Sequence, residues 1–481
     1  MAETNLLGAK VKALRRREGI TQIDLAKRLN VSPSYLNLIE NNRRPLTASL
    51  LLELAKVFQI DLATFAAGED DARNAADLLE VFGDPMFDNH GITTADVREI
   101  CAASPNIARA ILTLYRSYVD ARTSAETLAE RVSDGQEATG VGSARLPSEE
   151  VGDMIQHHMN YFPEVEEAAE ALMRTARIDS EDVFRGLTRY LAEAHGIEVR
   201  TVRVADERKA MRRFDPERRM LSLSEVLPPR SRRFQLAHQA GLLTCGALFD
   251  RIAKDEAITT PESRALARVA LANYFAAAVL MPYAPFLDAA KAERYDIELL
   301  AHRFGASFEQ VCHRLTTLRR PGAEGIPFHL LRIDVAGNIS KRFSGSGIKI
   351  ARFSGACPRW NVHAAFLTPG MIRVQTSRMP DGVGYFCIAR TIRSDRGGYN
   401  VPHAMHAIGM GCEIKYAKNM VYSDGMDLHN EDAIIKVGVT CRLCDHPDCE
   451  QRAFPSIRNP LRIEENVRGV SFYAPVTPKS A

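Results

Sequence analysis

Residues 21–40 read TQIDLAKRLNVSPSYLNLIE, which contains two short amphipathic helices separated by a three-residue turn. Thr21 is placed to cap the first helix, and Ser32 followed by Pro33 is placed to start the second. Ala26 is small where the two helices must cross closely. The apolar positions expected to form a shared core are Leu25, Leu29, Val31, Leu36 and Ile39, closed by Leu50, Leu54 and Val57 on the next helix. The pattern therefore predicts a helix-turn-helix.

The outward face of the second helix is polar. Ser34, Tyr35 and Asn37 can donate and accept hydrogen bonds at base edges in a major groove, and polar side chains beside the motif can hold phosphates. The candidate DNA-binding residues are Gln22, Ser32, Ser34, Tyr35, Asn37, Asn41, Arg43 and Arg44. They resemble the Cro and phage-repressor type of helix-turn-helix, which implies that a dimer binds double-stranded DNA at paired half-sites. The alternative is an ordinary helical bundle whose charges are only solvated.

Length and composition set limits on the rest of the chain. Its 481 residues are enough for roughly three domains, and 46% hydrophobic with 25% charged residues is typical of a globular protein. No apolar run reaches the roughly eighteen residues that a membrane span needs, and the polar first residues lack the apolar stretch of a secretory signal. We therefore expect no membrane segment and a cytoplasmic location. The net charge of +2 favours no class of partner, although basic residues are dense in the first 45 positions.

Changes in periodicity divide the chain and predict a multidomain protein, mainly α with α+β parts. The expected parts are a five-helix domain over 6–68, a helical connector and flexible linker over 69–147, an α+β domain over 148–325 and a β-rich domain over 326–481. Ser104 and Pro105 are expected to start a long helix through Arg131, and residues 133–143 read as the linker. Strands are expected over 198–204, 328–335, 372–376 and 385–391.

Residues 233–242, RFQLAHQAGL, look like the zinc-binding helix of metallopeptidases fused to such DNA-binding domains. A working site needs two histidines four positions apart and a glutamate beside the first, but Gln239 and Leu242 stand where two of these groups belong. Residues 271–282 also resemble that fold and lack its acidic ligand. We expect no enzyme here, a hydrogen-bonded core role for His238, and a cleft adapted to an effector. The alternative is a DNA-tethered metallopeptidase of a stress response.

Residues 441–449, CRLCDHPDC, place three of the nine cysteines close together. Three thiolates in such a loop can converge on a 4Fe-4S cluster or on zinc, and both need four ligands. The expected metal ligands are Cys441, Cys444, Cys449 and Cys412, with Cys357 as the other candidate for the fourth cysteine and His446 as a further ligand for zinc. Three reduced thiols in a turn are the alternative. A related alternative function is a regulator that senses iron or oxidants through these cysteines.

Together, these parts resemble the short-chain fatty acyl-CoA regulator family of bacterial transcription factors. The resemblance rests on the helix-turn-helix, the His238 helix, and residues 332–342 (RIDVAGNISKR), 356–362 (ACPRWNV) and 441–455. It implies control of propionate, acetate or glyoxylate-pathway genes in response to an acyl-CoA such as propionyl-CoA or acetyl-CoA. It also implies that some relatives hold a four-iron cluster.

An acyl-CoA presents phosphates and an adenine ring, so its site needs basic groups and an aromatic ring. The candidate acyl-CoA-binding residues are Arg219, Arg233, Tyr274, Arg332, Lys341 and Arg342, with Tyr161 as a second ring. The alternative for each is a solvated surface charge or a core aromatic residue. We hypothesise that the ligand changes the separation or mobility of the DNA-binding heads in a homodimer or homotetramer, through the linker near Gly140.

Overall fold

The computed structural model describes residues 8, 11–12, 14–15, 18, 20–40, 44, 46–58, 69–133, 146–179, 182–203, 210–351, 356–394, 403–442, 444–446 and 449–456. The chain forms two compact units, and each is described by itself. The first unit comprises Met1–Ala144, Ala351–Ser354 and Cys441–Ala481, and the second comprises Arg145–Ile350 and Gly355–Thr440. The prediction of a multidomain protein, mainly α with α+β parts, is confirmed.

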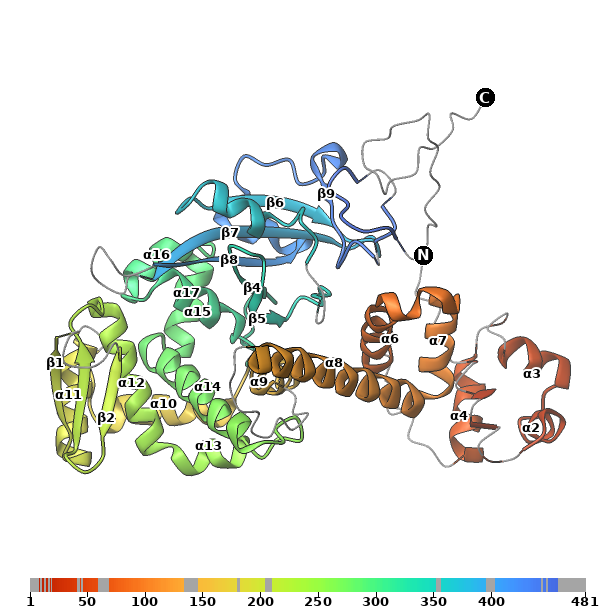
Figure 1. Ribbon diagram of the computed structural model, residues 1–481. Helices are drawn as coiled ribbons and strands as arrows, with labels where there is room; N and C mark the ends of the chain where they lie inside the picture. The colour runs from red at the N-terminus through yellow and green to blue at the C-terminus, as the bar shows by residue number, and fades with distance from the viewer. Residues whose placement is uncertain are drawn as a thin grey trace. The chain divides into compact units, whose positions relative to one another are not determined.

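The helix-turn-helix forms as the sequence predicts, with α2 (Gln22–Arg28), α3 (Pro33–Glu40) and α4 (Ala48–Phe58) (Figure 1). The Thr21 hydroxyl accepts a hydrogen bond from the Asp24 N–H at 3.2 Å, and the Ser32 hydroxyl accepts one from the Tyr35 N–H at 3.1 Å. Both caps satisfy amides that the first helical turn leaves without partners. The expected apolar residues other than Ile39 pack in one core, in which Leu25, Leu36 and Leu54 are fully buried, and Ile39 is also fully buried. Residues 59–68, the last part of the expected five-helix domain over 6–68, lie outside the described residues.

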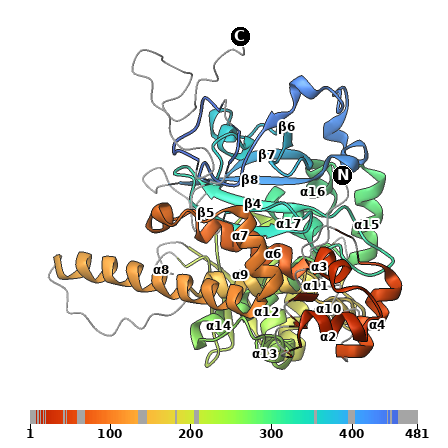
Figure 2. The same ribbon diagram turned by 90° about the vertical axis from the view of Figure 1, so that its right-hand side faces the viewer.

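A second helical group follows in the first unit. It contains α6 (Glu69–Val81), the 3-10 helix η1 (Pro85–His90), α7 (Thr94–Ala103) and α8 (Pro105–Ser133). These elements share a core of their own around Leu78, Val97 and Leu112. As predicted, α8 begins at Pro105, and Figure 2 shows it as one long continuous helix. The expected linker around Gly140 lies outside the described residues.

Helices dominate the first part of the second unit. They are α9 (Pro147–His157), α10 (Pro163–Thr175), α11 (Val183–His195), α12 (Pro229–Thr244), α13 (Gly246–Ile252), α14 (Pro261–Leu280), α15 (Tyr283–Ala292), α16 (Ile297–Arg303) and α17 (Phe308–Thr316). The central helix α14 packs closely on α12 at Gly241, where a Cβ atom would lie 2.7 Å from the Phe275 ring. Glycine is therefore what permits this close helix crossing. A small sheet in the order β1-β3-β2 accompanies these helices and confirms the strand expected after residue 198. Its strands are β1 (Glu198–Val202), β2 (Arg212–Asp215) and β3 (Met220–Ser224).

A six-stranded sheet completes the second unit, in the order β5-β4-β8-β7-β6-β9. Its strands are β4 (His329–Asp334), β5 (Ile339–Ser344), β6 (Arg373–Arg378), β7 (Gly384–Ser394), β8 (Ala404–Glu413) and β9 (Ile435–Lys436). The short helices with it are α18 (Asn361–Ala364), η2 (Ala365–Leu367), η3 (Ile414–Asn419), η4 (Val421–Ser423) and η5 (Glu431–Ala433). The pairings are antiparallel except for β6 with β9. The three predicted strand segments of this region are confirmed as β4, β6 and β7.

Both faces of this sheet are covered, because successive side chains of a strand point to opposite faces. Leu330 and Ile388 on one face join the large core of the helices, whereas Leu331 and Ala389, one residue further along each strand, pack against Val362 of α18. The helical part and the sheet therefore share one hydrophobic core within the second unit.

Among the described helices, none is by itself long and apolar enough to cross a membrane. α14 and α15 meet that criterion only as a pair, across a bend of 66°.

Candidate functional site

The helix α3 presents a polar face in the way that its sequence predicts. Leu36 and Ile39 point into the core, which leaves Ser34 and Asn37 exposed and Tyr35 half-buried. Arg44 is exposed just beyond the helix, whereas the candidates Asn41 and Arg43 lie outside the described residues. An exposed helix face of this kind can enter a major groove and contact base edges.

The carboxylate of Glu40 holds this helix in place, a role that the sequence analysis did not anticipate. Glu40 is the last residue of α3 and is 3% exposed. Arg15 donates hydrogen bonds to its two oxygens at 2.6 and 3.0 Å, and the Gln22 side chain donates to Oε2 at 2.9 Å. The amide of Gln22, a phosphate-binding candidate, is therefore engaged within the domain. The sequence offered one signal for this role, because Glu40 is a charged residue directly after Ile39 on the apolar side of the helix.

In the degenerate peptidase motif, an arginine side chain lies beside the one remaining histidine, where a working peptidase would bind its metal ion. His238 of α12 is 3% exposed, and the Arg212 guanidinium of β2 is hydrogen-bonded to its Nδ1. Burial first, and then the Arg212 charge, lowers the pKa of His238 to about 3, against a hydrogen bond with the Val269 backbone. His238 is thus a neutral, hydrogen-bonded core residue, as the sequence analysis expected. A fixed cation beside the ring opposes binding of a second cation there.

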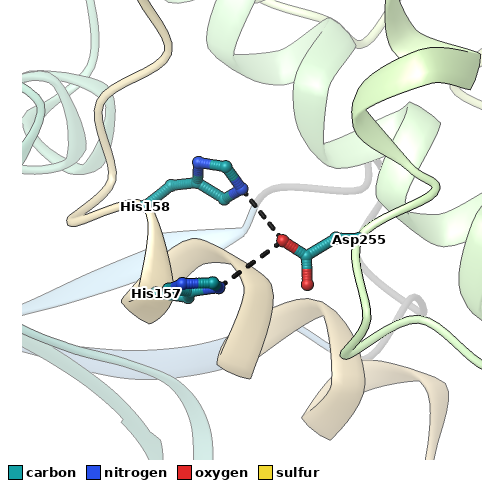
Figure 3. Close-up of side chains that lie close together, drawn as sticks. All are labelled: His157, His158 and Asp255. Carbon is teal, nitrogen blue, oxygen red and sulfur yellow. Dashed lines mark hydrogen bonds and ion pairs between the residues drawn. The ribbon is translucent and has the colours of Figure 1, made fainter. Parts of the chain in front are cut away.

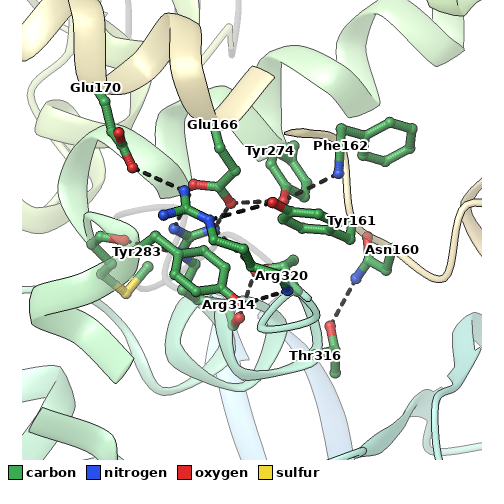
Figure 4. Close-up of polar contacts among 12 residues, drawn as sticks. Asn160, Tyr161, Phe162, Glu166, Glu170, Tyr274, Tyr283, Arg314, Thr316 and Arg320 are labelled. Atoms are coloured by element: carbon green, nitrogen blue, oxygen red, sulfur yellow. Dashed lines mark hydrogen bonds and ion pairs between the residues drawn. The ribbon is translucent and has the colours of Figure 1, made fainter. Parts of the chain in front are cut away.

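A buried polar network fastens three helices of the second unit (Figure 4). Arg314 of α17 and Glu166 of α10 are 0% and 1% exposed and form a two-point ion pair. The Tyr274 hydroxyl of α14 donates to Glu166 at 2.7 Å, and Arg314 also donates to the Met281 carbonyl at 2.9 Å. Removing one partner of such a buried pair typically costs about 3–5 kcal/mol, because the other charge is left uncompensated.

The two aromatic rings that were candidates for stacking on an adenine have partners within the protein. Tyr274 is 7% exposed and packs edge-on against Phe162. Burial, followed by the nearby Glu166 carboxylate, raises the pKa of Tyr274 well above its ordinary value. Tyr161 lies beside Tyr283, and its hydroxyl accepts a hydrogen bond from Arg320 at 3.4 Å. Tyr274 is therefore part of the hydrophobic core, and the half-buried Tyr161 lies at its edge.

The structure brings two of the basic acyl-CoA candidates together. Arg332 of β4 and Lys341 of β5 are cross-strand partners, and both contact Glu309 of α17, at 3.0 and 3.2 Å. Lys341 Nζ also lies 3.3 Å from His313 Nε2. Burial acts to raise the pKa of Glu309, but hydrogen bonding with His313 and the Lys341 and Arg332 charges lower it far more.

The other basic candidates lie elsewhere in the same unit. Arg219, exposed between β2 and β3, donates to the His195 carbonyl at 3.0 Å. Arg233 of α12 donates to the Gly305 carbonyl at 2.6 Å. Arg342 is half-buried on β5 opposite Leu331. The six candidates therefore do not converge on one site in this conformation.

The cysteine loop is organised by an arginine. Arg452 donates hydrogen bonds to the carbonyls of Cys441, Cys444 and His446, at 2.7, 2.8 and 2.7 Å. Cys444 and Cys449 are buried, and Cys441 is half-buried and accepts a backbone hydrogen bond from Ala453 at 3.5 Å. Residues 443, 447 and 448 lie outside the described part of the chain.

The charges of the neighbouring cysteines affect the pKa of one thiol of the loop. Burial raises the pKa of Cys444, and the neighbouring Cys449 and Cys441 add to the increase. Thiolates held close together are destabilised by mutual repulsion, which a bound metal ion relieves. Three soft sulfur donors around one loop therefore fit zinc or an iron–sulfur cluster.

The two candidates for a fourth cysteine ligand lie in hydrophobic surroundings. Cys412 of β8 is fully buried, and its Sγ lies 3.8 Å from the Met420 sulfur. Burial raises the pKa of Cys412, which disfavours the thiolate that a metal requires. Cys357 is buried in a small cluster with Ile348 and Met379.

Three family models match successive parts of the chain. They are described as "Helix-turn-helix" over residues 11–65, "IrrE N-terminal-like domain" over 192–316 and "Short-chain fatty acyl coenzyme A regulator, C-terminal" over 317–473.

Similar proteins match over nearly their whole length. The chain is 41% identical over 471 residues to the HTH-type transcriptional regulator RamB of Mycobacterium tuberculosis, covering 97% of this chain and 98% of that protein. It is 40% identical over 476 residues to the propionyl-CoA carboxylase regulator of Cereibacter sphaeroides, covering 98% and 99% of the two chains. A solved structure of a Mycobacterium tuberculosis transcriptional regulator superimposes with a TM-score of 0.66 at 39% identity, covering 69% of this chain and all of the other.

Proposed function

Since the chain belongs to the family of short-chain fatty acyl coenzyme A regulators, we propose that it controls genes of short-chain acyl metabolism by binding promoter DNA in response to an acyl-CoA. Propionyl-CoA is the first candidate for the effector, because one similar protein is named a propionyl-CoA carboxylase regulator, and acetyl-CoA is the second. DNA binding also implies a cytoplasmic location.

The observation that carries this proposal is the exposed polar face of α3. Ser34 and Asn37 face solvent on a helix whose other side is anchored by Leu36, Ile39 and the buried Glu40. Such a rigid, outward-facing helix suits contacts with base edges. A homodimer or homotetramer would supply the two heads that paired half-sites need.

For the effector, the paired Arg332 and Lys341 are the strongest basic candidates. Two cations share the single carboxylate of Glu309, so this cluster keeps excess positive charge that a CoA phosphate could neutralise. We propose that phosphate competes with Glu309 for these side chains. Arg219, Arg233, Tyr274 and Arg342 would then have structural roles.

The cysteine loop favours a second input to the same regulator. We propose that Cys441, Cys444 and Cys449 hold a 4Fe-4S cluster, with zinc as the alternative, and we leave the fourth ligand unassigned. A bound cluster would supply a group that responds to iron and oxidants. Its support is the loop geometry, in which Arg452 holds the carbonyls of two of the three cysteines.

A DNA-tethered metallopeptidase is the less favoured function. The Arg212 guanidinium occupies the position next to His238, and Gln239 and Leu242 replace the general base and the second histidine. We therefore propose a regulator without peptidase activity.

The test is a DNA-binding titration of the full-length protein with its own promoter and with random duplex at one fixed, moderate salt concentration. Each titration is made with and without propionyl-CoA and acetyl-CoA. We expect preference for the promoter, and an acyl-CoA should change promoter affinity by the same factor by which promoter DNA changes acyl-CoA affinity. Equal affinity for both duplexes under every condition would refute DNA regulation. If the protein prefers its promoter but acyl-CoA and promoter DNA do not change each other's affinity, only the proposal of an acyl-CoA effector would be refuted.

A pair of variants tests the effector site. Lys341→Gln should weaken acyl-CoA binding roughly tenfold or more, because one charged hydrogen bond to phosphate is lost. Arg264→Gln removes an exposed arginine of α14 in the same unit, and this variant should bind the ligand like wild type. Equal weakening by both variants, or by neither, would exclude Lys341 as a ligand contact.

A further inference from the structure

Two adjacent histidines meet a buried carboxylate at the end of α9 (Figure 3). His157 is the last residue of α9 and His158 is its cap, so the chain leaves the helix between these two rings. Asp255 lies in the segment that follows α13, 97 positions from His158. The fold thus brings two imidazoles and one carboxylate together from two separate segments of the second unit.

The spacing of the three ligand atoms suits a metal ion. Asp255 Oδ2 lies 3.6 Å from His157 Nδ1 and 3.0 Å from His158 Nε2, and all three atoms lie within 4.8 Å of one another. In a tetrahedral zinc site with bonds of about 2.0–2.1 Å, neighbouring ligand atoms are about 3.3 Å apart. Only small side-chain adjustments would therefore be needed, and the largely exposed His157 can make them freely.

The carboxylate is held in position from behind. The Asp255 side chain is 8% exposed, and its Oδ1 accepts a hydrogen bond from the Ala257 N–H at 2.9 Å. This leaves Oδ2 directed at the two histidines. The ring of His158 packs on Phe162 with centroids 5.0 Å apart, which limits its rotation. Ligands oriented by such outer contacts lose less entropy when a metal binds.

A cavity of about 400 Å³ lies next to these groups, with His158 and Asp255 in its wall. Lys254 and Arg251 also line it, and Arg251 is paired with Glu164. An ion held by three protein ligands would therefore have space for a water molecule or a small anion as its fourth ligand. Zinc sites with three protein ligands and a water molecule in the fourth position are well known.

We propose that His157, His158 and Asp255 bind one divalent transition-metal ion, Zn²⁺, with one coordination position open to the cavity. Two imidazoles and a carboxylate are ligands that zinc accepts, and they discriminate against Mg²⁺ and Ca²⁺, which favour all-oxygen sites. The bound ion would link the end of α9 to the segment after α13. This site is distinct from the His238 motif and from the cysteine loop.

The experiment is a Co²⁺ titration of metal-free, full-length protein, followed by visible absorption. Cobalt bound to nitrogen and oxygen ligands shows d–d bands without the intense thiolate charge-transfer bands that cysteine ligands produce, so the cysteine loop is distinguishable. We expect one such nitrogen- and oxygen-bound Co²⁺ per chain, displaced by Zn²⁺. Its absence from wild-type protein would overturn the proposal and leave a histidine–aspartate contact that holds no metal.

Matched variants assign the ligands. His157→Gln removes an exposed ligand with little risk to folding, and Asp255→Asn can still accept the Ala257 hydrogen bond; both should lose this Co²⁺ spectrum. His302→Gln, an exposed histidine of α16, should retain it. An unchanged Co²⁺ affinity in both ligand variants would refute the site.

A thermal measurement gives a readout independent of the spectrum. Zn²⁺ should raise the unfolding temperature of the second unit in wild-type and His302→Gln protein, since a ligand that binds only the folded state stabilises it. His157→Gln should show no such rise at the same Zn²⁺ concentration. A rise of equal size in His157→Gln would contradict the assignment.

Discussion

The guanidinium of Arg15 donates hydrogen bonds of 2.6 and 3.0 Å to the two carboxylate oxygens of Glu40, the last residue of the recognition helix α3. Arg15 also donates to the Ile20 carbonyl at 3.1 Å, and hydrogen bonding with Glu40 raises the pKa of Arg15. The pair therefore connects the start of the domain, the approach to α2 and the end of α3. This ion pair fixes the end of α3, the helix whose exposed polar face is proposed to contact DNA.

We expect Glu40→Gln to loosen the helix-turn-helix. Hydrogen bonds to a charged group are worth about 1.5–3 kcal/mol, so amide exchange in α2 and α3 should accelerate roughly ten- to a hundredfold. Hydrogen-exchange mass spectrometry of the full-length protein reports this segment by segment. Glu99→Gln, at an exposed position of α7, should leave exchange in α2 and α3 unchanged. Unchanged protection in Glu40→Gln would show that the pair contributes nothing to local stability.

Asn37→Ala should reduce specific DNA binding more than non-specific binding. A lost base contact costs about 1–3 kcal/mol, which is roughly a 5- to 150-fold loss on the promoter with little change on random duplex. Competition titrations with the two duplexes measure this difference. Equal losses on both duplexes would place Asn37 away from the bases.

Arg44 tests the phosphate contacts separately. Arg44→Gln should weaken binding to all sequences and lower the slope of log affinity against log salt by about one. Titrations over a series of salt concentrations give the slope. Arg98→Gln, an exposed arginine of α7, is the matched control and should keep the wild-type slope.

His238→Gln should leave the zinc content of the protein unchanged. The Arg212 guanidinium is hydrogen-bonded to the histidine ring, and its charge opposes a metal ion at that position. Elemental analysis of zinc-loaded protein compares the variant with wild type. Introducing Gln239→Glu and Leu242→His together should add no zinc, because the Arg212 charge still opposes the ion and residues 271–282 still lack the acidic ligand. Loss of one zinc in His238→Gln would instead revive the peptidase alternative.

Arg452→Gln should weaken retention of the metal or cluster by the cysteine loop roughly tenfold or more, although no thiol is lost. The reason is that the loop carbonyls of Cys441, Cys444 and His446 lose their shared donor. Arg452→Lys should recover little, because an ammonium lacks the planar fork that reaches several carbonyls. Visible absorbance and iron content of anaerobically purified protein measure retention. Arg264→Gln, exposed on α14, should match wild type.

The second unit should become less stable in mild acid. His329 is 6% exposed, its Nδ1 is hydrogen-bonded with Ser346 at 2.8 Å, and burial lowers its pKa to about 3. A histidine in the unfolded chain has a pKa of about 6.5. Between the folded and unfolded pKa values, the unfolded chain therefore binds a proton at this histidine and the folded chain does not. Unfolding free energy should therefore fall with pH by about 1.4 kcal/mol per pH unit for each such histidine.

His329→Gln removes one of these histidines and leaves His238 as another. Between about pH 6 and pH 4, its unfolding free energy should fall less steeply than that of wild type, by up to about 1.4 kcal/mol per pH unit. Urea unfolding followed by Trp360, the only tryptophan of the chain, measures the slope. An equal slope in His329→Gln would show that His329 titrates normally.

Much of the fold could be predicted because its signals are local. Thr21 and Ser32 cap helices through amides three positions ahead, and the core of α2 and α3 follows from helical spacing. The strand β4 likewise follows from a run of residues that pack on its two faces. The cysteine loop was visible because its three thiols lie within nine positions.

The partners of buried charges could not be predicted in this way. His238 and Arg212 are 26 positions apart, and Glu166 and Arg314 are 148 apart. Tyr274 was a candidate ring for a ligand, yet its hydroxyl completes the Glu166 network. No periodicity connects such positions, because their pairing arises only when helices from distant parts of the chain pack together.

The sequence by itself therefore determined the helix-turn-helix, the order of its helical and β-rich parts, and the loss of the peptidase ligands. Only the tertiary structure decided that Glu40 anchors α3, that Arg332 and Lys341 share Glu309, and that two histidines meet Asp255. The physical reason is that caps and amphipathic faces depend on near neighbours in the chain. A buried polar group must instead find a partner wherever packing brings one within hydrogen-bonding distance.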